Sequence, residues 1–162
     1  MIAITGLLTL SVFGQAAETK RSKKSKKSKV EKQFIAPADV FPAKGYSHGI
    51  AVRGGRTIYV AGQIALNKQG ELVGKDDVRA QTEQVFENIK AVLAASGATF
   101  ADVVKINYYV KNLKPELLPA IREVRDRFLP KDQPPPASTL AGVESLFRDD
   151  ILIEIECVAV VE

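Results

Sequence analysis

The sequence predicts an α+β sandwich, in which one mixed β-sheet carries two helices on one face in the order β-β-β-α-β-α-β-β. Residues 103–111 and 151–162 have the period-two side-chain pattern of strands. Residues 78–96 and 115–129 repeat apolar side chains at helical spacing. Because one sheet and two helices make two layers, both helices are expected on the same face of the sheet.

Turn residues define the first half of the domain. Gly54 and Gly55 separate the strand-like runs GIAVR and TIYVAGQIAL, and they predict a hairpin. The stretch NKQGE, residues 67–71, predicts a second turn. Asp76 or Asp77 is then expected to cap the start of the first helix.

The second half alternates strand, helix and strand. After the strand at 103–111, Pro115 suits the first turn of a helix. The stretch PPPASTLAGVE, residues 134–144, combines a rigid connection with a strand predicted near 139–144. In the last strand alternate apolar residues form a face that is expected to lie under the helices.

The net charge of +4 belongs to the N-terminal segment and not to the domain. Residues 1–32 hold 8 of the 23 Lys and Arg residues and 2 of the 19 Asp and Glu residues, which leaves 15 basic and 17 acidic residues. Such a domain is not expected to bind nucleic acid. The single cysteine, Cys157, excludes an intrachain disulfide and is expected to be a buried, inert thiol. With His48 as the single histidine, a Cys/His zinc site is excluded and no metal is expected.

The chain is predicted to have three regions: a signal peptide at 1–17, a Lys/Ser-rich disordered linker at 18–33 and a folded domain at 34–162. The apolar run at 2–13 is too short for a membrane span and is followed by small residues, which favours export to the periplasm or the cell exterior. No positive charge precedes Lys20, and the alternative is a mis-assigned start or a disordered leader on a cytoplasmic protein. The linker is interpreted as a solvated spacer, with contact to anionic surfaces as the alternative.

The second face of the last strand predicts a partner. It carries Leu152, Val158 and Val160 together with Glu154 and Glu156. Because the helices cover only the other face, we expect another subunit to cover this one, with the N-terminal segment as the alternative.

The two glutamates of this face lie two residues apart, hence on the same side of the strand. Acidic side chains among apolar neighbours are usually paired or bind something. One interpretation is a carboxylate that orients water or substrate at a subunit interface. The other is an interface ion pair, for instance with Lys105 or Arg148.

From about residue 40 onward the sequence resembles the Rid family, the YjgF-like reactive intermediate deaminases. The residues that carry the resemblance are Ala61-Gly62-Gln63, Gln81, Asn88, Asp102-Val103-Val104-Lys105, Pro136-Ala137 and Ile153-Glu154-Ile155-Glu156. The resemblance implies a chorismate-mutase-like fold and a homotrimer with the sheets inside and small-molecule clefts between subunits. It also implies hydrolysis of reactive enamines and imines to 2-keto acids and ammonia, with no metal or organic cofactor.

Residue roles are implied in the same way. Glu154 matches a strand glutamate that positions water, and Tyr46 matches a loop tyrosine that borders the cleft. The family arginine that holds the substrate carboxylate is replaced by Ser138, as in members that lack this arginine. A serine supplies neither a fixed charge nor a fork of donors, so the usual 2-imino acid is not the expected substrate. Ser138 and Thr139 are expected to bind substrate, and Tyr46 or His48 to move a proton.

Two functions are therefore considered. The first is an enzyme that hydrolyses an imine, an enamine or a related small metabolite in an inter-subunit cleft, with Glu154 as its catalytic residue. The second is a non-catalytic homotrimer that binds a small metabolite.

Overall fold

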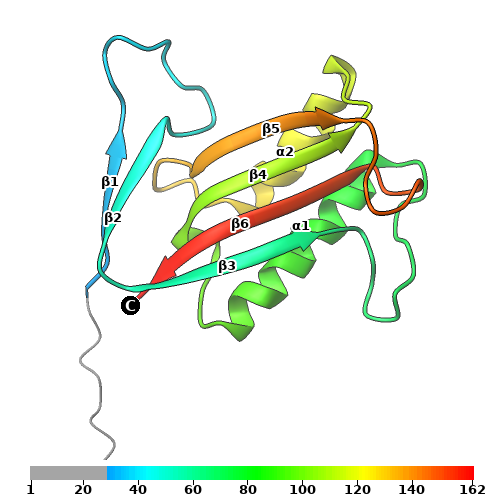
Figure 1. Ribbon diagram of the computed structural model, residues 1–162, viewed down its shortest axis with the longest axis horizontal. Helices are drawn as coiled ribbons and strands as arrows, with labels where there is room; N and C mark the ends of the chain where they lie inside the picture. The colour runs from blue at the N-terminus through cyan, green and yellow to red at the C-terminus, as the bar shows by residue number, and fades with distance from the viewer. Residues whose placement is uncertain (1–28) are drawn as a thin grey trace, which may run out of the picture.

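The computed structural model describes residues 29–162 and has the predicted order of elements (Figure 1). The predicted signal peptide and most of the predicted linker lie outside the described residues. The strands are β1 (Glu31–Ile35), β2 (Gly49–Arg53), β3 (Arg56–Gln63), β4 (Val103–Lys111), β5 (Ala137–Val143) and β6 (Ile153–Val161). The helices are α1 (Val78–Ala95) and α2 (Leu118–Phe128), and short 3-10 turns at Phe100–Asp102 and Pro115–Leu117 precede β4 and α2.

Four strands form the main sheet in the order β3-β6-β4-β5. β6 pairs antiparallel with both β3 and β4, whereas β4 and β5 are parallel. The parallel pair requires a crossover, which α2 supplies. Both helices lie behind this sheet in Figure 1, which confirms the predicted α+β class and the placement of the helices on one face.

The remaining strands, β1 and β2, form a separate two-stranded ribbon beside the main sheet (Figure 1). The prediction of one sheet therefore holds for four of the six strands. Gly54 and Gly55, with φ of 77° and 75°, turn the chain between β2 and β3, but these strands are not paired. Regular structure also starts at Glu31, so residues 31–33 belong to β1 and not to the linker to which we assigned them.

The core lies between the helices and the covered face of the sheet. α1 contributes Phe86 and Ile89, and α2 contributes Ile121, all fully or almost fully buried. Alternate residues of β4 and β6, including Ile106 and Ile155, pack against them, as the period-two pattern predicts. Among the described residues, no helix lies over the opposite face of the sheet (Figure 1).

Asp77, and not Asp76, caps α1. Its carboxylate accepts hydrogen bonds from the amides of Arg79 and Ala80, at 2.9 and 3.1 Å. Asp76 has a φ of 59°, so it forms the turn before the cap. Among residues 29–162, we find no helix with the length and apolar character of a membrane span.

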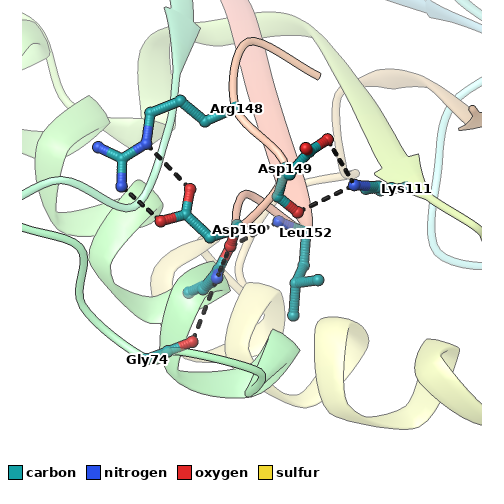
Figure 2. Close-up of polar contacts among 7 residues, drawn as sticks. Gly74, Lys111, Arg148, Asp149, Asp150 and Leu152 are labelled. Carbon is teal, nitrogen blue, oxygen red and sulfur yellow. Dashed lines mark hydrogen bonds and ion pairs between the residues drawn. The ribbon is translucent and has the colours of Figure 1, made fainter. Parts of the chain in front are cut away.

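Gln81, buried completely in the first turns of α1, ties the helix to the loop before β6, in which Figure 2 labels Arg148, Asp149, Asp150 and Leu152. Its amide nitrogen donates to the carbonyls of Gly74 and Asp150, at 3.2 and 2.8 Å. Its oxygen accepts from the amide of Leu152, at 2.7 Å. Arg148 and Asp150 pair in the same loop, at 2.9 Å between Nε and Oδ1. These bonds fix the point at which β6 starts, and thereby the position of its first glutamate.

We expect Gln81→Leu to destabilise the protein by roughly 2 to 4 kcal/mol, because the carbonyl of Asp150 and the amide of Leu152 lose their partner. The carbonyl of Gly74, in contrast, still accepts from the amide of Asp77. Urea unfolding followed by circular dichroism should show a lower midpoint with an unchanged slope. The matched control is Gln84→Leu on the same helix, where the amide donates only to the side chain of Asn88. An equal loss of unfolding free energy in the two variants would show that the buried hydrogen bonds of Gln81 contribute no more stability than the side-chain contact of Gln84.

Candidate functional site

The β1–β2 loop, residues 36–48, is fastened to the start of β5. The buried Ser47 hydroxyl donates to the carbonyl of Pro135 at 2.5 Å, and the Ser47 amide donates to that of Pro136 at 3.1 Å. Ser47 also forms an isolated parallel bridge with Ala137. Residues 134–136 thus bind the β1–β2 loop through their backbone carbonyls, and this contact holds Tyr46 close to the first residues of β5.

This docking encloses a cavity of about 250 Å³, which we call the helix-side pocket. Tyr46 of the loop, Tyr108 of β4, Arg122 and Arg125 of α2, and Ser138 of β5 line it. The register explains why Ser138 is here: it pairs with Ile106, whose side chain is in the core, so Ser138 also points to the helix side.

The other side of the sheet, which we call the open sheet face, carries Lys105, Asn107, Tyr109, Glu154 and Glu156. Asn107 Nδ2 and the Tyr109 hydroxyl both donate to Glu156 Oε1, at 2.8 and 2.9 Å. The bond from Asn107 lowers the pKa of Glu156 most, and the bond from Tyr109 lowers it further. The hydrogen bond to Glu156 in turn raises the pKa of Tyr109. The buried Asn107 Oδ1 has no partner among the described residues.

Thr139 also lies on the open sheet face, one residue after Ser138 and hence on the opposite side. Its hydroxyl accepts a hydrogen bond of 2.7 Å from Lys105 Nζ. Lys105 is therefore occupied within the chain, and Arg148 is bound to Asp150. Within the described part of the chain neither forms an ion pair with Glu154 or Glu156, and the interface ion pair considered from the sequence stays a prediction.

Glu154 is half-buried, and its carboxylate has no hydrogen bond or ion pair with another described residue. It lies against Gly62 of β3, where a Cβ atom would overlap the carboxylate. The β3–β6 register shifts between Val60 and Gln63, which gives the carboxylate this space. A side chain at position 62 would therefore displace the Glu154 carboxylate from the place it has here.

The predicted site residues separate into three places. Tyr46 and Ser138 line the helix-side pocket, whereas Thr139 and Glu154 lie on the open sheet face. The rings of His48 and Tyr46 are 5.5 Å apart, and both residues border a second hollow, in which His48 Nε2 is 2.9 Å from the carbonyl oxygen of Phe41. A single chain thus brings Tyr46 next to Ser138 and His48, but not next to Thr139 or Glu154.

Four polar lining residues of the helix-side pocket were missed by sequence reasoning: Lys44, Tyr108, Arg122 and Arg125. Tyr108 has the position of a core residue in β4, and the arginines have the spacing of a solvated helix surface. The signal that was available is the hydroxyl that Tyr108 adds to an otherwise apolar strand face.

Cys157 is buried in β6, and burial raises the pKa of its thiol to about 12. The predicted burial of the thiol is therefore confirmed, and its inertness stays a prediction that the raised pKa supports, since the thiolate is the nucleophilic form. Within residues 29–162 no group of three or more His, Cys, Asp or Glu side chains is arranged to hold a metal ion.

The fold and these surfaces define a small α+β protein with one uncovered sheet face and a separate loop-and-strand pocket. Residues 37–161 match the sequence model of the family described as Endoribonuclease L-PSP. The chain belongs to this family, whose members include the Rid and RutC proteins, and the resemblance stated from the sequence is confirmed.

Similar proteins support this assignment. A 2-iminobutanoate/2-iminopropanoate deaminase from Dermatophagoides farinae is 36% identical over 128 residues, which cover 79% of this chain and 92% of the relative. The structure of YyfB from Yersinia pestis, a Rid-family protein of unknown function, has a TM-score of 0.74 and 41% identity, covering 80% of this chain and 98% of that one. RidA from Psychrobacter sp. has a TM-score of 0.58 and 33% identity, covering 80% and 99%.

We expect Tyr109→Phe to raise the pKa of Glu156 toward its ordinary value of 4.5, because the carboxylate loses one of two donors. A lowered folded-state pKa contributes stability that is present above the ordinary pKa and lost as pH falls through the folded-state pKa. The variant should therefore lose less stability on acidification through this range.

Carboxyl carbon NMR titration measures this shift directly, and urea unfolding at several pH values measures its effect on stability. Tyr59→Phe is the control, because Tyr59 is exposed and has no hydrogen bond to Glu156. An identical Glu156 titration in wild type and Tyr109→Phe would contradict the assigned contact.

Proposed function

We propose that this protein hydrolyses a small imine or enamine in a cleft between subunits of a homotrimer, with Glu154 orienting the attacking water. The observation that carries the proposal is the Glu154 carboxylate, which lies unpaired against Gly62 on the open sheet face. Membership of the family supports it, as does the printed activity of the Dermatophagoides farinae relative.

The need for a second subunit is argued from the division of the candidate residues. Tyr46 and Ser138 are on the helix side of the sheet, whereas Glu154 is on the opposite side. Tyr59, which is 81% exposed, adds apolar surface to the open sheet face at its β3 edge. A cyclic assembly would cover such surface and set Glu154 of one subunit against the pocket of the next.

The chemistry needs one water and no cofactor. Glu154 accepts a proton from water while the water oxygen bonds to the imine carbon, and the C=N electron pair takes up a proton at nitrogen. The amine of the carbinolamine then takes the proton held by Glu154 and leaves as ammonia, while the hydroxyl returns a proton to the group that protonated the nitrogen and becomes the carbonyl. An enamine enters the same route after tautomerising to the imine. We assign proton transfer at nitrogen to Tyr46 or His48, and hydrogen bonding of the substrate to Ser138 and Thr139.

Ser138 limits which substrates the strand itself can bind. A serine hydroxyl offers one donor and no charge, whereas arginine offers a planar fork of donors with a permanent charge. We therefore propose that the substrate is not the usual 2-imino acid, whose carboxylate an arginine on this strand would bind. A non-catalytic metabolite-binding trimer is the alternative that the following experiment separates from an enzyme.

Imines should be generated from a series of amino acids and amines by an oxidase, and their decay followed with purified protein. We expect at least one imine to decay faster, and Glu154→Gln to lower kcat/KM by about 100-fold or more, as removal of a general base does. Glu144→Gln, an exposed change of the same kind on the segment after β5, is the control.

Light scattering on the same samples should report a trimer for wild type and both variants. A monomer at micromolar concentration would contradict the inter-subunit cleft. No acceleration with any imine, including neutral and amine-bearing ones, would contradict the hydrolase and leave the binding trimer.

A further inference from the structure

The helix-side pocket is lined by positive charge. Lys44, Arg122 and Arg125 all contribute to its wall, and no acidic residue does. Neither Lys44 nor Arg122 has a hydrogen bond or ion pair with another described residue. Hydroxyl groups of Tyr46 and Ser138 add further donors to the same wall. A small concave site with this composition attracts an anion.

Arg125 is held in place by the protein. Its Nε and Nη2 atoms bind Asp126 Oδ1 at 2.7 and 2.6 Å, and Nη1 donates to the carbonyl of Gly45 at 3.4 Å. Its side chain is only 20% exposed. Asp126 does not line the pocket, and these contacts leave one N–H on each of the two Nη atoms for a ligand. The guanidinium is thus oriented before any ligand arrives.

Tyr108 provides an independent indication of a missing acceptor. Its side chain is 3% exposed, and its hydroxyl has no partner among the described residues although it belongs to the pocket wall. A buried hydroxyl without a partner costs free energy, which a ligand acceptor would recover. Burial raises the pKa of Tyr108, so the phenol stays protonated and remains a donor at neutral pH.

We propose that this pocket binds the oxyanion group, carboxylate or phosphate, of a small metabolite, with Arg125 and Arg122 supplying the charge and Tyr108 a hydrogen bond. The inference rests on the pocket itself and also deepens the proposed function, since it makes the substrate an anion held by α2. Ser138 is part of this arrangement. Its short side chain leaves free the space next to α2 that an arginine at the same position would occupy.

The test is equilibrium binding, by calorimetry and by chemical-shift changes, of 2-oxobutanoate, inorganic phosphate and the neutral ketone butanone. We expect at least one of the two anions to bind and butanone not to bind. Comparison of the two anions shows whether the natural group is a carboxylate or a phosphate. The dissociation constant should rise with salt concentration.

Arg125→Gln should weaken anion binding by about 10-fold or more, as loss of a charge-assisted hydrogen bond does. Arg127→Gln on the same helix is the matched control, because Arg127 pairs with Glu83 outside the pocket and should bind the anion like wild type. If Arg125→Gln fails to fold, Arg122→Gln and Tyr108→Phe replace it. Arg122 is exposed, and phenylalanine keeps the ring of Tyr108; both should weaken binding several-fold.

Three results would overturn the proposal. The first is no binding of either anion, and the second is equal binding by Arg125→Gln, Arg122→Gln and wild type. The third is dissociation of the assembly in the arginine variants, which would mean that a carboxylate of a second copy fills the pocket. The failure of one proposal can be distinguished from the failure of the other. Anion binding without imine hydrolysis would contradict the proposed enzyme activity but not the anion site. An unchanged rate of imine hydrolysis in Arg125→Gln would contradict the anion site but not the enzyme activity.

Discussion

The parallel register between β4 and β5 is the constraint from which the arrangement of the site follows. It pairs Ile106 with Ser138 and Asn107 with Thr139. Residues that pair across two strands project to the same side of the sheet, whereas successive residues of one strand project to opposite sides. The hydroxyls of Ser138 and Thr139 therefore lie on opposite faces of the sheet. One joins the pocket beneath α2, and the other binds Lys105 on the uncovered face. No side-chain rotation can reunite them within one chain.

Two loops are held against this scaffold by hydrogen bonds, and their positions complete the two surfaces. Ser47 fastens the β1–β2 loop to the prolines before β5, so the loop closes the pocket that the strand and α2 leave open. Gln81 fastens the loop before β6 to α1, so the first glutamate of β6 arrives beside Gly62. Both attachments use buried hydrogen bonds to backbone atoms, which fix the chain more firmly than contacts between exposed side chains. Each of the two surfaces is therefore set by a loop that is bound to the scaffold.

Local patterns were sufficient for the order of elements, because helical and strand periodicities are properties of neighbouring residues. They were not sufficient for pairing, and β1 and β2 form a ribbon apart from the main sheet. Placing the start of β5 near residue 139 left Ser138 in the connection, which hid its opposition to Thr139. Arg122 and Arg125 have the sequence pattern of a solvated helix surface, and only the packing of α2 beside the β1–β2 loop makes them part of a pocket. Contacts between segments so far apart in the chain have no local signature.

The charges on the two surfaces are complementary in a way that bears on catalysis. A carboxylate in the role proposed for Glu154 repels an anionic substrate, and the repulsion is strong where water is excluded. An anionic substrate can therefore approach it only if cations hold the anionic group from another side. In this chain Ser138 contributes no charge, whereas the helix below it contributes the unpaired charge of Arg122 and the guanidinium of Arg125, whose charge Asp126 partly neutralises. Under the two proposals, the positive charge lies on the helix and not on the strand, so the anionic group of the substrate would sit in a different place and a different metabolite would fit.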